Sequence, residues 1–258
     1  MTLEDIKKIF QPNKDGRHFI YDTFKDLYFP NEDHIFLDSA WSNLELLPDY
    51  KREIAISALC LAAARKQPRG VFTITDFRYD DGRKALRLPL KDLFIQAAHE
   101  YNIAIFDNGQ QNRSICSDIF NVNEDDFDLV YLDPPYAPPS DDADYIKRYH
   151  FLEGLSVYWK DMNIMENTKT KKIEKIYTPF AYKKSICEAL QNTIHKFRKS
   201  IIVLSYSSNS IPDEYEILRL LKAEKRDIEI IRIPYKYSFG THKSALQRQT
   251  NELLFIAK

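Results

Sequence analysis

From Ser114 to the C-terminus, short apolar segments alternate with segments of helical character, and this pattern constrains the fold more than any other feature. The predicted strands are residues 129–132, 201–204, 228–233 and 252–256, and the predicted helices between them are residues 143–159, 182–197 and 213–223. Alternation of this kind is typical of a mostly parallel sheet covered by helices. The sequence therefore predicts an α/β fold for this part of the chain.

The predicted strand at residues 129–132 is followed directly by Asp133, Pro134, Pro135 and Tyr136. Proline has no N–H donor and a fixed φ, so the carbonyl groups of such a turn are free to face a ligand. An amino group bound there could donate one hydrogen to the Asp133 carboxylate and the other to the Pro134 carbonyl, while its heterocycle stacks on Tyr136. An ordinary turn after a strand is the alternative. Ligands of open α/β sheets bind at the carboxyl ends of strands, which favours a functional role.

Together with its flanks, the Asp-Pro-Pro-Tyr stretch resembles the DNA adenine-N6 methyltransferases of the D12 class, in their alpha arrangement. The supporting matches are residues 31–38, Ser117 with Asp118, residues 145–153, residues 202–207 and residues 251–256. The resemblance extends from about Asn31 to the C-terminus, and Asp-Pro-Pro-Tyr is its most specific part. It implies site-specific transfer of a methyl group from S-adenosylmethionine to adenine N6 of double-stranded DNA, as in restriction-modification.

The resemblance also implies a partial Rossmann-like methyltransferase sheet. The predicted strands match the fourth to seventh strands of that sheet, with the last pair antiparallel, and residues 115–117 are a candidate for the third. The expected domains are an N-terminal helical segment at residues 1–40, an inserted target-recognition lobe at residues 41–110 and the C-terminal part of the catalytic domain at residues 111–258. Within the lobe we predict a helix at residues 51–66 and a hairpin that begins with a strand at residues 71–74.

One feature of the family has no counterpart in this sequence. The family carries an aromatic-x-Gly-x-Gly loop that holds the amino acid part of S-adenosylmethionine. Here every glycine is isolated, namely Gly16, Gly70, Gly82, Gly109, Gly154 and Gly240. No two of them can form a tight turn that cradles a cofactor.

The first two strands of the family's sheet have no candidate either. The first strand lies beside the strand that ends at Asp133, so its absence predicts an unpaired edge. We therefore expect a split enzyme, in which a second protein subunit supplies the loop and these strands by strand addition. The alternatives are a fragment of a longer chain and a methyltransferase-like protein that binds DNA without catalysis.

The resemblance assigns further residues to the site. Asp118 and Asp133 are expected to contact the cofactor, although Asp118 could equally cap a helix or a turn. Tyr206 and Ser207 are expected to line the pocket for the target base. The same four-residue motif also suits methylation of an amide in a protein, but the flanking matches favour DNA.

A protein that binds duplex DNA usually has a basic surface, yet the net charge of this chain is −1. Contacts with phosphates must therefore come from local clusters. We predict that Arg78, Arg83 and Lys84 in the lobe and Lys243 near the C-terminus contact DNA. A solvated charged face is the alternative for each of these clusters.

Composition favours a cytoplasmic protein, neither exported nor membrane-spanning. No run of about 18 apolar residues is present. Cys60, Cys116 and Cys187 are far apart, so we read them as reduced thiols. His150 and Glu153 lie one helical turn apart, and we assign them to the stability of the fold. No metal is therefore expected.

Overall fold

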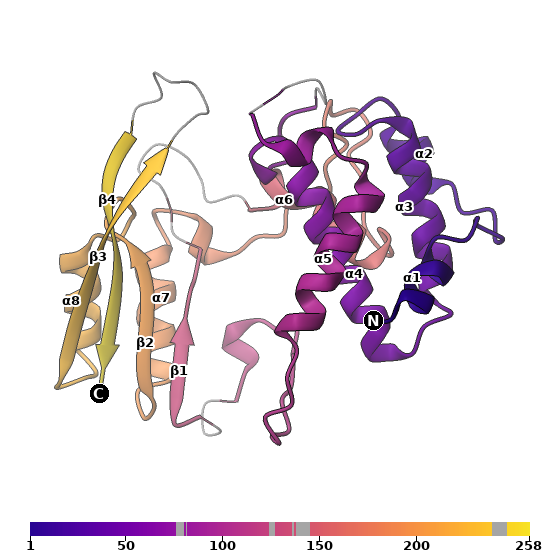
Figure 1. Ribbon diagram of the computed structural model, residues 1–258. Helices are drawn as coiled ribbons and strands as arrows, with labels where there is room; N and C mark the ends of the chain where they lie inside the picture. The colour runs from indigo at the N-terminus through magenta and orange to yellow at the C-terminus, as the bar shows by residue number, and fades with distance from the viewer. Residues whose placement is uncertain (76–79, 81, 124–126, 136, 138–144, 239–246) are drawn as a thin grey trace. The chain divides into compact units, whose positions relative to one another are not determined.

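The computed structural model describes residues 1–75, 80, 82–123, 127–135, 137, 145–238 and 247–258 (Figure 1). The chain divides into two compact units. Residues 1–110 and 145–175 form the first, here called the helical unit, and residues 111–144 and 176–258 form the second, the sheet unit. Residues 145–175, which we expected in the catalytic domain, thus group with the N-terminal region.

The helical unit is built from α-helices and short 3-10 helices. They are α1 (Leu3–Ile9), α2 (Phe19–Phe24), α3 (Asn31–Leu44), α4 (Asp49–Lys66), η1 (Pro68–Gly70), η2 (Lys84–Arg87), α5 (Leu90–Ala104) and α6 (Tyr145–Val157). A proline with extended backbone precedes α3, α4 and α5 at Pro30, Pro48 and Pro89. α4 ends just before Pro68. Proline lacks the N–H that would continue the helix and disfavours helical backbone in the residue before it. The predicted helix at residues 51–66 is confirmed as part of α4.

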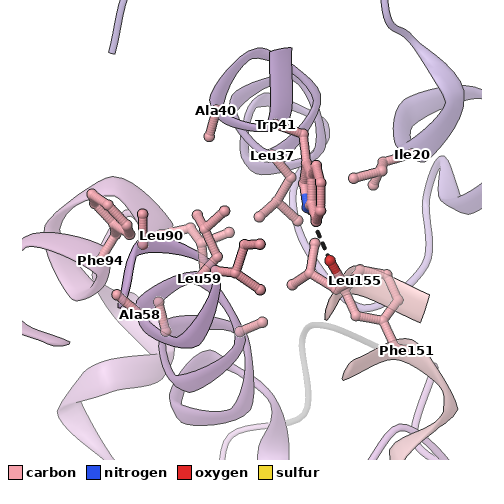
Figure 2. Close-up of a cluster of buried hydrophobic side chains, with 14 of the residues drawn as sticks. Ile20, Leu37, Ala40, Trp41, Ala58, Leu59, Leu90, Phe94, Phe151 and Leu155 are labelled. Atoms are coloured by element: carbon pink, nitrogen blue, oxygen red, sulfur yellow. Dashed lines mark hydrogen bonds between the residues drawn. The ribbon is translucent and has the colours of Figure 1, made fainter. Parts of the chain in front are cut away.

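The core of the helical unit explains why residues 145–175 belong to it. Figure 2 shows apolar side chains from α2, α3, α4, α5 and α6 meeting in one cluster. The Trp41 indole N–H of α3 donates to the Leu155 carbonyl of α6 at 2.9 Å. The buried ring of Phe151 stacks on that of Phe72, with centroids 4.8 Å apart. Helix α6 therefore fills the centre of this unit.

Residues 71–74 form no strand, so the predicted hairpin is wrong at its first strand. The Phe72 N–H donates to the Arg148 carbonyl of α6 at 2.7 Å. The Gln67 side-chain amide donates to the carbonyls of Val71 and Ile74 at 3.1 and 2.6 Å. Backbone groups that a hairpin partner would bind are thus taken by other segments.

The sheet unit contains one four-stranded sheet. Its elements are η3 (Ile119–Asn121), β1 (Leu129–Leu132), η5 (Pro179–Ala181), α7 (Ile186–Lys196), β2 (Ile201–Ser207), α8 (Glu214–Lys222), β3 (Ile228–Ser238) and β4 (Gln247–Ala257). The strand order is β1-β2-β4-β3. β1 and β2 are parallel, whereas β4 is antiparallel to both of its neighbours. The α/β character and the antiparallel last pair are confirmed, but residues 115–117 form no strand.

Helices α7 and α8 lie on the same side of the sheet (Figure 1). Leu190 of α7 and Ile217 of α8 share a buried cluster with Leu204 of β2 and Phe255 of β4. α8 begins at a sequence-encoded cap, because the Asp213 side chain accepts from the Glu216 N–H at 2.9 Å. The helices thereby cover one face of the sheet.

Candidate functional site

The candidate site lies at the carboxyl end of β1. Asp133, Pro134 and Pro135 follow the last residue of the strand, Leu132, which pairs with Leu204 of β2. Asp133 is exposed, and the two prolines are half-buried. Tyr136 lies outside the described residues. An exposed carboxylate at the carboxyl end of a parallel strand is accessible to a ligand.

The turn after β1 is anchored by a loop that follows β2. Buried Ala137 forms an antiparallel bridge with Ile211, whose N–H donates to the Ala137 carbonyl at 2.9 Å. The Tyr206 hydroxyl in turn donates to the Ile211 carbonyl at 2.6 Å. Pro134 and Pro135 are thus held between a paired strand and a fixed bridge. Sequence reasoning missed this anchor because Ala137 and Ile211 are far apart in the chain and carry no common motif.

Tyr206 and Ser207, which we expected to line the base pocket, are both buried at the end of β2. The predicted strand ended at Leu204, but β2 continues to Ser207, so both residues lie within the sheet. The Tyr206 side chain is fully buried in the core of the sheet unit. Ser207 is also buried, with its hydroxyl 3.4 Å from that of Thr250. The Tyr206 hydroxyl helps to position the loop after β2, and a role of both residues in the base pocket stays a prediction.

Asp118 is exposed and caps the short helix η3. Its side-chain Oδ1 accepts from the Phe120 N–H at 2.9 Å. The Phe120 ring stacks on Phe180, and its carbonyl accepts from the Lys196 ammonium at 3.0 Å. The capping role that the sequence left open for Asp118 is therefore present, and contact with the cofactor stays a prediction.

Two of the residues predicted to contact DNA, Arg78 and Lys243, lie outside the described residues. Arg83 donates from its guanidinium to the Gln67 carbonyl at 2.6 Å, which ties the loop before η2 to the end of α4. Lys84, at the start of η2, is exposed. Contact of Arg83 or Lys84 with DNA stays a prediction.

The helical unit has an open cavity of about 590 Å³ that the sequence did not reveal. Its lining is Arg17, Trp41, Glu45, Arg52, Glu53, Ile56, Ser156, Val157, Tyr158 and Lys160. Arg17 pairs with Glu45 at 2.6 Å and Arg52 with Glu53 at 3.1 Å. The charges of the two arginines are thus offset by neighbouring carboxylates.

His150 has the structural role that the sequence predicted. Its Nε2 lies 3.2 Å from the Phe72 carbonyl and 3.1 Å from the Tyr28 hydroxyl, in the buried core. Among the described residues, no group of three or more His, Cys, Asp and Glu side chains is arranged to hold a metal ion. Within the same residues, no helix combines the length and apolar character needed to span a bilayer.

Comparison with known proteins identifies a class that the chain resembles, since the curated relatives are named type II methyltransferases and a modification methylase. The type II methyltransferase M2.HphI of Haemophilus parahaemolyticus is 26% identical over 276 residues, which cover 100% of this chain and 76% of that protein. The modification methylase StsI of Streptococcus sanguinis is 26% identical over 226 residues, covering 84% of this chain and 31% of StsI.

The type II methyltransferase M.FokI of Planomicrobium okeanokoites is 28% identical over 133 residues, which cover 51% of this chain and 20% of M.FokI. No protein-family model and no solved structure matches the chain. The chain thus spans 76% of M2.HphI but only 31% and 20% of the other two relatives, which carry much additional chain.

Proposed function

We propose that the chain is the base-binding subunit of a site-specific DNA methyltransferase that methylates adenine N6. The observation that carries the proposal is the exposed Asp133, with Pro134 and Pro135, at the carboxyl end of β1 in a chain whose relatives are methyltransferases. The mixed sheet adds support, because its last two strands pair antiparallel, as the resemblance implies.

The chemistry of this end of β1 suits an exocyclic amino group. In our proposal the Asp133 carboxylate accepts one N6 hydrogen, the Pro134 carbonyl accepts the other, and Tyr136 stacks on the base. The base must first leave the duplex stack, at a cost of a few kcal/mol that stacking partly offsets. The bridge between Ala137 and Ile211 holds the turn, so the two acceptors are oriented before the base arrives.

The residues of the sheet unit fit the cofactor only in part. S-adenosylmethionine, when bound, supplies a methyl group on a positively charged sulfur. Asp118 and Asp133 are the carboxylates that we assign to it. The only glycine in the sequence of this unit is Gly240, which lies outside the described residues. A Gly-x-Gly cradle is therefore missing from the unit, and we propose that a second subunit supplies it.

The test is an assay for N6-methyladenine in duplex DNA by this chain co-expressed with a chain that carries the aromatic-x-Gly-x-Gly loop. Asp133→Ala should lower methylation at least about a hundredfold while leaving DNA affinity within about twofold. Asp128→Ala is the matched control, because Asp128 is also an exposed carboxylate, at the amino end of β1, and should retain activity. Equal loss of DNA affinity in Asp133→Ala would show that Asp133 is structural.

The same assay distinguishes the proposed function from its alternatives. A complex that binds duplex DNA but gives no N6-methyladenine would identify a methyltransferase-like DNA-binding protein without catalysis. Methylation of a protein amide instead of DNA would show that the site acts on a different class of substrate.

A further inference from the structure

The open cavity of the helical unit has the size of a site for a small ligand. Its volume of about 590 Å³ lies within the range of pockets that hold small molecules, roughly 300–1,000 Å³. Helices α3, α4 and α6 and the segments beside them form its walls, so every lining residue belongs to one unit. The candidate site for methyl transfer belongs to the other unit, at the carboxyl end of β1. The cavity is therefore a separate candidate site.

Part of the cavity lining is apolar. Ile56 and the ring of Trp41 are buried, and Val157 of the same lining is 43% exposed. The Trp41 indole N–H donates to the Leu155 carbonyl at 2.9 Å, so it is not available to a ligand (Figure 2). These three side chains thus offer a ligand apolar contact, against which a planar ring can pack.

Two cations of the lining, Arg52 and Lys160, are suited to bind an anion. Arg52 pairs with its neighbour in sequence, Glu53, at 3.1 Å, and its guanidinium carbon lies 5.8 Å from the centroid of the Trp41 ring. The side chains of this ion pair are 37% and 65% exposed, and exposed pairs contribute little to stability, so Arg52 can exchange Glu53 for a ligand at small cost. Lys160 is exposed, and the described part of the chain contains no ion pair of Lys160.

The turn after α6 holds its part of the cavity in a strained conformation. Tyr158, Trp159 and Asp161 have φ values of 54°, 54° and 59°, in the left-handed region that residues with side chains rarely adopt. The Tyr158 hydroxyl donates to the Asp38 carboxylate at 2.6 Å. A Cβ at Gly154 would lie 2.1 Å from the Trp159 ring, so this ring packs directly on α6. Backbone strain persists where the surrounding structure enforces it, and it clusters at functional sites. The turn thus supports a binding role for the cavity.

We propose that this cavity binds a nucleotide, either free or within a nucleic-acid strand. The planar donors of Arg52 match a phosphate bidentately, and the Lys160 ammonium adds a second positive charge. The base packs on the apolar part of the lining, and Glu53, once released by Arg52, accepts from an amino group of the base or a sugar hydroxyl. A purely anionic ligand would meet the carboxylates of Glu45 and Glu53 in the same lining, whereas a nucleotide carries both a phosphate and hydrogen-bond donors. Binding at this site does not depend on methyl transfer in the sheet unit.

The experiment measures binding of deoxyadenosine monophosphate, deoxyadenosine and inorganic phosphate to the full chain by isothermal titration calorimetry. We expect the nucleotide to bind with a Kd below about 1 mM and the other two at least about tenfold more weakly, because each lacks one part of the contacts. Arg52→Gln and Lys160→Gln should each weaken binding of the nucleotide at least about tenfold. Arg65→Gln is the matched control and should stay within about twofold, because Arg65 is on the same helix, outside the lining, and pairs with Glu100.

A short single-stranded oligonucleotide distinguishes the two sources of the ligand. Binding at least about tenfold tighter than that of the mononucleotide, and weakened in Arg52→Gln, would identify a nucleotide within a strand, and any smaller difference would identify a free nucleotide. No binding of the nucleotide, phosphate binding as tight as that of the nucleotide, or wild-type affinity in both Arg52→Gln and Lys160→Gln would overturn the proposal. Circular dichroism of each variant checks that the fold is retained. The methylation assay bears on the proposed function alone.

Discussion

The helical unit and the sheet unit differ in how completely each buries its own apolar surface. In the helical unit the rings of Tyr28, Phe72 and Phe151 are at most 1% exposed, and they pack on one another from three segments of the chain. In the sheet unit β1 pairs only with β2 among the described residues, and Tyr131 on β1 is 60% exposed. The helical unit is therefore closed around its core, whereas in the sheet unit apolar side chains of β1 stay exposed at the edge of the sheet.

Truncation of a ring in the core of the helical unit should have the largest effect on stability. Phe151→Ala removes a fully buried ring, so we expect it to lower the free energy of unfolding of the helical unit by about 3–5 kcal/mol. Phe106→Ala is the control, because Phe106 of the same unit is 80% exposed and should change stability by less than about 0.5 kcal/mol. Hydrogen exchange of peptides from each unit in a urea series measures both. Similar values for the two variants would contradict a closed core.

Acid should weaken the helical unit through two buried histidines. Burial lowers the pKa of His34 and of His150 to about 4, from an ordinary 6.5. The unfolded chain binds protons below pH 6.5 while the folded unit does not, so this stability is fully present above pH 6.5 and is lost as the pH falls towards 4. Each histidine accounts for about 3 kcal/mol, at most, of the stability that the helical unit loses over this pH range.

Exchange measured between pH 7 and pH 4 tests this dependence. His34→Phe should make the loss of stability of the helical unit with falling pH shallower. A pH profile unchanged by that substitution would show that His34 does not carry the effect.

Removal of the N-cap of α8 should have a smaller effect on the stability of the sheet unit. Asp213→Ala removes the acceptor for the Glu216 N–H, so we expect a loss of about 1 kcal/mol. Asp213→Asn keeps an acceptor and should retain most of the stability. Thermal unfolding of the two variants side by side provides the measurement, and equal midpoints would rule out a capping contribution.

The smallest effect is expected at the exposed side chain of Tyr131 on β1. Tyr131→Ala should change the stability of the isolated chain by less than about 0.5 kcal/mol, because its ring packs on no core. Leu132→Ala, one residue along the same strand but buried against the helix side, should cost about 2–5 kcal/mol. A large loss in Tyr131→Ala would show that another part of this chain packs against the Tyr131 ring.

The sequence predicted the elements whose signals are local. Strand β1 was predicted at its observed bounds, because an apolar run ends at two prolines. The prediction of a strand at residues 71–74 was wrong. The Phe72 N–H donates instead to the backbone carbonyl of Arg148, which is far along the chain. Tertiary contacts of this kind override local propensity.

The motif of the site could be predicted from the sequence, but the contacts that hold the turn in place could not. Asp133 and the prolines were found from the sequence, and the structure places them at the carboxyl end of β1. The sequence did not show that the Tyr206 hydroxyl donates to the Ile211 carbonyl across a loop. The anchor of the turn is a long-range contact, and no local pattern encodes it.

The measurement that tests the central claim most directly is the yield of N6-methyladenine from the purified, monomeric chain given S-adenosylmethionine and duplex DNA. Our account predicts no product from the chain alone and product once a chain with the aromatic-x-Gly-x-Gly loop is added. Methylation by the monomer without any partner would contradict it.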